Sequence, residues 1–143
     1  MRILDVCRFS VISEYNVSTC SPGLQRVLRK AIRCAPRYLD FAVICGHRNK
    51  LDQEEAFKTG KSQKRWPNSK HNTDPSKAAD IRPASPFSQA DWKDVVRFGR
   101  IMGFIEAVAI EEGVPLRLGL DWNGDGRTID EKFQDLGHLE DAA

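Results

Sequence analysis

Two of the three histidines in this sequence, His71 and His138 but not His47, stand near carboxylates in a pattern that suits a metal ion. Asp80 follows His71 by nine residues, and Asp135 precedes His138 by three. Two imidazoles and one carboxylate leave the fourth tetrahedral position of a zinc ion free for water, as in catalytic rather than structural zinc sites. The candidate ligands are therefore His71, Asp80 and His138, and the chemistry would be hydrolysis.

The surroundings of Asp80 and His138 favour this interpretation. Asp80 stands between Ala79 and Ile81, so in a strand its carboxylate points away from the side that these apolar residues face. A carboxylate at the edge of a core must be paired, hydrogen-bonded or bound to a metal. Asp135 lies one short turn before His138, where it can take a proton from attacking water and pass it to a leaving amine.

The residue pattern alone leaves a second interpretation open. In it, the two histidines have satisfied hydrogen bonds, the aspartate is salt-bridged, and all three are structural. The sequence contains neither His-Glu-x-x-His nor Gly-x-Ser-x-Gly. Because no helix would carry two ligands, any site must be assembled from segments that are far apart in the chain.

The elements that must position these groups fit one small domain. The chain has 143 residues, of which 41% are hydrophobic and 29% charged, so we expect one catalytic domain over residues 1–143. The expected helices cover 21–34, 51–58 and 91–112, and the expected strands or extended segments cover 41–45, 77–82, 116–120 and 137–140. Helices and short strands mix without regular βαβ alternation, which predicts the α+β class.

Two of the helices have clear local patterns. Ser21 followed by Pro22 predicts a capped helix start, and Pro36 disfavours helix at the residue before it. The helix over 91–112 should bury an apolar stripe and end at Gly113. The stripe consists of Trp92, Val95, Met102, Ile105 and Ala109. Ser88 is the expected N-terminal cap of this helix.

The basic residues are concentrated in one segment. The net charge is only +2, which does not by itself indicate a polyanion partner, and we expect no nucleic acid to bind. Residues 58–70 nevertheless carry several cations and no acid: Lys58, Lys61, Lys64, Arg65 and Lys70, with Trp66 among them. This segment is either a solvated loop, the interpretation we favour, or a surface that meets an anionic polymer such as cell wall or nucleic acid.

The remaining features concern location, cysteines and a turn. The N-terminus lacks the apolar stretch of a secretory signal, so we expect a protein made in the cytoplasm without membrane insertion. We expect a monomer by default. Cys34 and Cys45 are expected to be small buried residues.

The segment 121–126 matches the first half of a calcium-binding EF-hand loop, but Lys132 stands where the loop needs glutamate. We therefore predict a tight acidic turn there, with Trp122 in the core, and leave cation binding open.

Taken in order, several motifs resemble the LAS-type zinc peptidases, known as peptidase family M15. The resemblance is to the L-alanyl-D-glutamate endopeptidase branch of phage endolysins, related to the D-Ala-D-Ala carboxypeptidases. It runs from Phe9 to Glu140. The motifs are Phe9-Ser10-Val11-Ile12-Ser13 with Pro22-Gly23-Leu24, Phe41 to Arg48 with Gln53, Gly60-Lys61-Ser62, Ser69-Lys70-His71 through Asp80, the stretch 119–126, and Asp135-Leu136-Gly137-His138.

The resemblance implies a fold and a site. The fold would be a short antiparallel sheet with helices packed on it, as in hedgehog domains and D-Ala-D-Ala peptidases. His71, Asp80 and His138 fall at the zinc ligands, Asp135 at the general base, and Arg48 at the arginine that stabilises the oxyanion. An arginine at a strand end can aim a fixed positive charge into a cleft. The implied activity is zinc-dependent hydrolysis of the L-Ala–D-Glu bond in peptidoglycan stem peptides, after release to the wall by a holin.

The chain departs from the family pattern at one motif. The family's commonest first motif, Ser-x-His-x-x-Gly-x-Ala-x-Asp, is two residues shorter, and here Asp74-Pro75-Ser76-Lys77 replaces its glycine. This puts the shape of the substrate groove in doubt, and Glu140 is expected at most to orient a ligand. Two alternatives remain open: a D-Ala-D-Ala carboxypeptidase of the same fold, and a zinc-containing binding protein that has lost catalysis.

Overall fold

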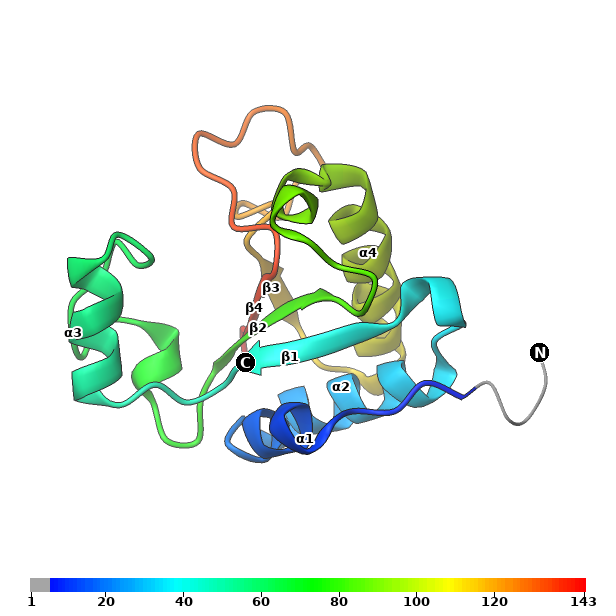
Figure 1. Ribbon diagram of the computed structural model, residues 1–143, viewed down its shortest axis with the longest axis horizontal. Coiled ribbons are helices and arrows are strands. Elements are labelled where there is room, and N and C mark those ends of the chain that lie inside the picture. The colour runs from blue at the N-terminus through cyan, green and yellow to red at the C-terminus, as the bar shows by residue number, and fades with distance from the viewer. Residues whose placement is uncertain (1–5) are drawn as a thin grey trace.

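The computed structural model of the chain describes residues 6–143 and contains four α-helices and four strands in that range (Figure 1). The helices are α1 (Val11–Ser18), α2 (Pro22–Cys34), α3 (Lys50–Lys58) and α4 (Val95–Glu112). The strands are β1 (Phe41–Cys45), β2 (Ala78–Pro83), β3 (Leu116–Leu118) and β4 (His138–Asp141). Three short 3-10 helices are η2 (Arg37–Leu39), η3 (Lys70–Asn72) and η4 (Gln89–Lys93).

The strands form one antiparallel sheet in the order β1-β2-β4-β3. Strand β2 pairs with β4 so that Asp80 stands opposite His138 and Ala79 opposite Leu139. Successive side chains of a strand point to opposite faces, so this register sorts the pairs by polarity. Ala79 and Leu139 point to one face, and Asp80 and His138 point to the other.

The apolar face of the sheet packs against α2 and α4. Fully buried side chains meet there from both layers: Leu24, Val27, Leu28 and Ala31 from α2, Phe98, Ile101, Met102 and Ile105 from α4, and Val43, Ile81 and Leu139 from the sheet. Burying this much apolar surface is the main stabilising contribution to the fold. The predicted α+β class, with a short antiparallel sheet and helices packed on it, is confirmed.

Helix α1 covers the outer edge of β1. The Ser13 hydroxyl accepts a hydrogen bond from the Val43 N–H at 3.0 Å, and the Asn16 amide donates to the Val43 carbonyl at 2.9 Å. Both polar groups of an edge residue are thus occupied, which protects the edge from pairing with another chain. We did not predict this helix, although Ser10 caps it by accepting from the Ser13 N–H.

The expected helix over 91–112 was wrong at its start. Ser88 and Asp91 cap each other and form η4, and Asp94 is not helical (φ −79°, ψ 76°) but caps α4 from outside. Helix α4 therefore begins at Val95, which is 52% exposed, and Trp92 is 41% exposed. The rest of the predicted stripe, from Met102 onward, is buried.

Two further observations concern the expectations on cysteines and membranes. Cys34 is exposed and Cys45 half-buried, so the prediction that both are buried was wrong: each is the last residue of its element and lies outside the core cluster. All four cysteines are free. None of the helices in residues 6–143 has the length and apolar character that crossing a membrane requires.

Candidate metal and catalytic centre

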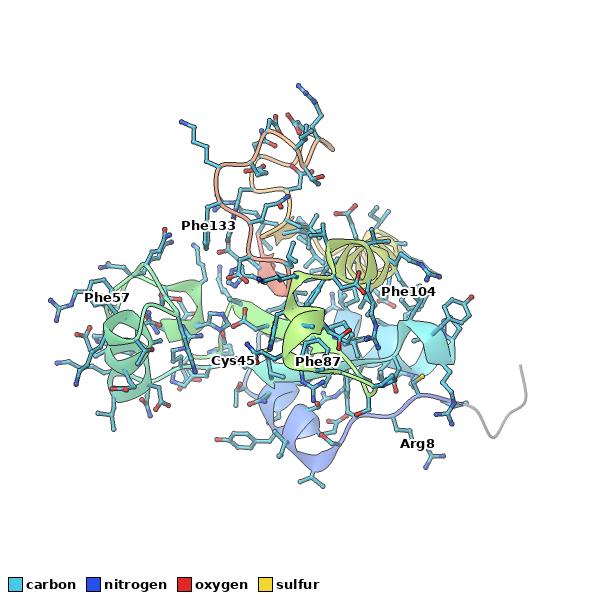
Figure 2. All side chains as sticks on the ribbon, turned by 45° about the horizontal axis from the view of Figure 1, so that its top comes forward. Arg8, Cys45, Phe57, Phe87, Phe104 and Phe133 are labelled. Carbon is cyan, nitrogen blue, oxygen red and sulfur yellow. The ribbon has the colours of Figure 1, made fainter. Side chains whose placement is uncertain are left out.

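A cavity of about 540 Å³ opens over the polar face of the sheet. Its walls come from residues 61–71, which follow α3, and from the long loop before β4. Figure 2 shows Phe57 on α3, which precedes the first wall, Phe133 on the loop that forms the second, and Cys45 near the sheet. All five predicted site residues line this cavity: Arg48, His71, Asp80, Asp135 and His138.

Asp80 and His138 are held together by strand pairing. His138 Nδ1 lies 3.0 Å from Asp80 Oδ1, and its other nitrogen, Nε2, lies 3.1 Å from Glu140 Oε1. Both partners are carboxylates, so either nitrogen can donate; when Nε2 donates to Glu140, Nδ1 is available to bind a cation beside Asp80. Glu140 thus orients His138, the role expected for it.

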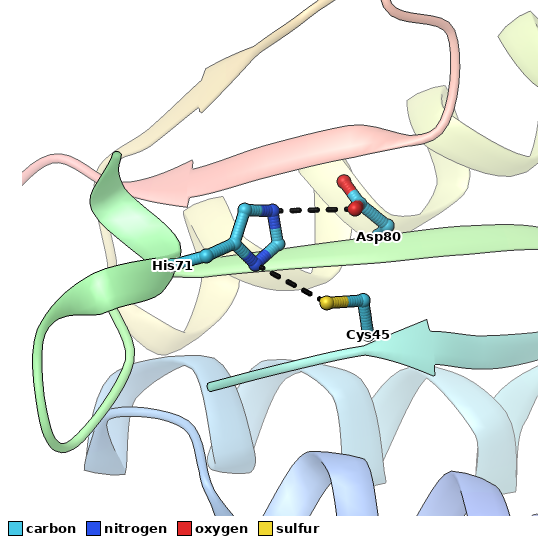
Figure 3. Close-up of side chains that lie close together, drawn as sticks. All are labelled: Cys45, His71 and Asp80. Carbon is cyan, nitrogen blue, oxygen red and sulfur yellow. Dashed lines mark hydrogen bonds and ion pairs between the residues drawn. The ribbon is translucent and has the colours of Figure 1, made fainter. Parts of the chain in front are cut away.

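His71 reaches the same place from η3. Its Nδ1 lies 2.7 Å from the Gly46 carbonyl oxygen, to which it donates, so Nε2 is the nitrogen left to face Asp80. Nε2 lies 3.2 Å from Asp80 Oδ2 (Figure 3). It is nevertheless the one buried side-chain N or O atom in residues 6–143 that makes no hydrogen bond. A buried polar atom without a partner is costly unless a ligand satisfies it.

The electrostatics of the centre favour a positive charge. Burial lowers the pKa of His71, but the Asp80 carboxylate outweighs burial and raises that pKa to about 10. Burial likewise lowers the pKa of His138, and hydrogen bonds to Asp80 and Glu140 raise it to about 9. Burial raises the pKa of Asp80, but the two histidines hold it well below its usual range. Without a metal, protons supply the positive charge that this cluster attracts.

The donor set therefore fits a metal ion. Atoms of Asp80, Asp135 and His138 lie within 4.8 Å of one another, and His71 Nε2 adjoins Asp80. Two imidazole nitrogens and carboxylate oxygens suit zinc and related divalent metals.

Cys45 is a neighbour of the centre that sequence analysis missed. Its thiol lies within 4.8 Å of ligand atoms of His71 and Asp80, 3.7 Å from His71 Nδ1. Figure 3 shows Cys45 on the Nδ1 side of His71 and Asp80 on the Nε2 side. Because Nδ1 donates to Gly46, Cys45 faces the wrong nitrogen to share a metal with His71 and Asp80. Its place at the end of β1, three residues before Arg48, was the available indication.

Asp135 enters the cavity from the turn before β4. Its N–H donates to the Gly119 carbonyl at 2.9 Å, and its carbonyl accepts from the His138 N–H at 3.1 Å. The same turn requires glycine at position 137, two residues after Asp135, because a Cβ there would collide with the Ile81 carbonyl. Burial, and next the Asp80 charge, raise the pKa of Asp135. A carboxylate with a raised pKa is suited to take up and release a proton.

Arg48 is held over the centre by a buried glutamine. One guanidinium nitrogen lies 3.6 Å from Asp80 Oδ2, and another donates to Gln53 Oε1 at 3.0 Å. Gln53 is fully buried on α3 and also accepts from Asn72, the neighbour of His71. The fixed position of Arg48 comes from this network, which the sequence indicated only through the spacing of Gln53.

Trp122 was expected in the core, but it lines the cavity instead. Its ring lies 5.4 Å from that of His138 and stacks under the Arg117 guanidinium at 5.0 Å. The predicted tight acidic turn next to it is confirmed, since the Asp121 carboxylate accepts from the N–H groups of Gly124 and Gly126.

Comparison with known proteins identifies the family. Residues 6–141 match the family described as phage L-alanyl-D-glutamate peptidase. The chain belongs to this family. It is 33% identical over 137 residues to the L-alanyl-D-glutamate peptidase of Escherichia phage T5, an alignment that covers 93% of this chain and 96% of the relative.

A solved structure supports the same assignment. The crystal structure of the Serratia marcescens L-Ala D-Glu endopeptidase ChiX superposes with a TM-score of 0.71 and 26% sequence identity, covering 97% of this chain and 92% of that one. The resemblance to LAS-type endopeptidases is thus confirmed, and this member of the phage L-alanyl-D-glutamate peptidase family is a peptidase.

Proposed function

We propose that this peptidase hydrolyses the L-Ala–D-Glu bond of peptidoglycan stem peptides with one zinc ion held by His71, Asp80 and His138. The observation that carries the proposal is the convergence of His71 Nε2, the Asp80 carboxylate and His138 Nδ1, with separations of 3.2 and 3.0 Å to Asp80. The names of the phage T5 and Serratia relatives supply the bond.

The ligand geometry supports a catalytic rather than a structural metal. Each imidazole is oriented by a hydrogen bond from its other nitrogen, His71 to the Gly46 carbonyl and His138 to Glu140. Such outer contacts fix the ligating nitrogen and its direction. Three protein ligands in an open cavity would leave a coordination position of zinc for water, and the ion would supply Lewis acidity and lower the pKa of that water to near neutrality.

Two residues carry the proton and charge steps in this proposal. Asp135 takes the proton from the attacking water and delivers it to the leaving amine of D-Glu, for which its raised pKa suits it. Arg48, fixed by Gln53, faces the cavity as a cation that stabilises negative charge on the carbonyl oxygen.

We also propose an oligomeric state and a place of action for this peptidase. It is a monomer that acts on the wall after a holin releases it. The match to a family of phage peptidases supports this route.

The test is cleavage of muropeptides of defined structure by zinc-loaded protein, with and without chelator, read by mass spectrometry. We expect a chelator-sensitive cut between L-Ala and D-Glu. A cut at D-Ala–D-Ala instead would keep the mechanism and change the substrate to that of a carboxypeptidase. Full activity in chelator would remove the metal from the proposal. Absence of any cut with zinc bound would favour a binding protein.

A further inference from the structure

The two walls of the cavity differ in charge. Residues 61–70 contain no aspartate or glutamate, and three of their lysines line the cavity: Lys61, Lys64 and Lys70. The opposite wall is mixed, because Asp130 and Glu131 line it beside Lys132. An anionic group of a bound substrate therefore finds its complement on the 61–70 wall.

The backbone of Lys64 is fixed by the residue that holds Arg48. The Gln53 amide donates to the Lys64 carbonyl at 2.6 Å and to the Ser62 hydroxyl at 3.0 Å. That hydroxyl also accepts from the Lys64 N–H at 3.1 Å. Lys64 thus projects from an anchored turn, and Gln53 couples the position of this turn to that of Arg48.

Lys64 lines the cavity, and its charge has no acidic partner there. Within residues 6–143, none of the three lysines has an acidic oxygen within 4.0 Å, whereas Arg48 pairs with Asp80 at 3.6 Å and Arg117 with Glu140 at 3.7 Å. Lys64 therefore adds an unpaired positive charge to the wall of the cavity that His71, Asp80 and His138 also line.

We propose that Lys64, with Lys61 and Lys70 beside it, binds the free α-carboxylate of the D-glutamyl residue on the leaving side of the scissile bond. This inference rests on the proposed function. In stem peptides D-Glu continues the chain through its γ-carboxyl group, so its α-carboxylate stays free, one carbon atom from the scissile nitrogen. A cation that binds it must lie at the rim of the same cavity, where Lys64 does.

The experiment compares two stem peptides that differ at this group alone, one with D-Glu and one with D-isoglutamine, whose α-carboxylate is an amide. Zinc-loaded wild-type protein should prefer the D-Glu peptide, and Lys64→Gln should lower kcat/KM for it by roughly tenfold. The D-isoglutamine peptide should be cut at nearly the same rate by both proteins. Lys58→Gln, an exposed lysine at the end of α3 outside the cavity, is the matched control and should change neither rate.

Calorimetry of the product peptide that begins with D-Glu provides a second readout without turnover. Lys64→Gln should weaken its binding by a similar factor and leave the amidated product unaffected. Equal losses for both peptides, or an equal effect of Lys58→Gln, would overturn the inference while the proposed function stands. If wild-type protein cut neither peptide, the proposed function would fail, and the inference with it.

Discussion

The two faces of the sheet are built from neighbouring residues but have opposite chemistry. Ile81 and Leu139 are fully buried under α2 and α4, while Asp80 and His138, next to them in sequence, face the cavity and contact each other at 3.0 Å. The alternation of side chains along β2 and β4 produces both faces at once. A register error of one residue would place the carboxylate in the core and destroy both.

The apolar face of the sheet acts as the support of the polar face. The site needs groups held in place, and close packing of the other face holds the two strands that carry them. The groups that come from outside the sheet, His71 on η3 and Asp135 in the turn before β4, are tied to this platform by hydrogen bonds to backbone carbonyls instead. His71 donates to Gly46 through Nδ1, and Asp135 donates to Gly119 through its N–H.

The largest effect should follow from removing a ligand on the polar face. His138→Ala should lose bound zinc and lower kcat/KM by roughly 10³-fold or more, because a metal ion supplies several kcal/mol of transition-state stabilisation. Metal content by mass spectrometry and cleavage rate are measured on the same sample. His47→Ala is the control, since His47 contacts the Thr73 carbonyl outside the cavity and should keep both. An active, metal-free His138 variant would refute the site.

Removal of the base should separate chemistry from metal binding. Asp135→Asn should lower kcat by roughly 10²- to 10⁴-fold, because proton transfer by a positioned side chain contributes that much, while zinc stays bound. Loss of zinc in this variant would instead make Asp135 a ligand, which its distance to Asp80 and His138 allows.

A smaller effect should follow at Arg48. Arg48→Ala should lower kcat by roughly 10²-fold with zinc retained, as when one donor to an oxyanion is removed. Gln53→Ala should produce part of this loss, because it releases the guanidinium while leaving the charge. Unchanged turnover in Arg48→Ala would reduce its contact with Asp80 to a structural ion pair.

The smallest effect on catalysis should come from the apolar face. Ile81→Ala should lower the free energy of unfolding by about 2–5 kcal/mol, the cost of a large-to-small change in a packed core. Activity per folded molecule should stay near the wild-type value at low temperature. Denaturant unfolding and cleavage rates measure the two quantities, with Ile44→Ala, 42% exposed on β1, as the control. A loss of activity without a loss of stability would contradict the division between the faces.

Local patterns predicted part of this fold. Ser21 and Pro22 begin α2 as expected, and the run Phe41–Cys45 forms β1, because capping and strand length act over a few residues. The predicted start of α4 was wrong because the helical spacing of Trp92 and Val95 continues across Asp94. Asp94 is the N-cap of α4, so the helix begins only after it. Spacing of apolar residues does not reveal such a break.

The sequence by itself determined which residues are available for the site and which face of a strand each occupies. The order of its motifs also predicted the family. Only the tertiary structure brought His71, Asp80 and His138 together, joined Arg48 to Gln53, and set Lys64 on a cavity wall. The reason is physical: the register between β2 and β4 depends on how both faces pack, and contacts between distant segments have no local pattern.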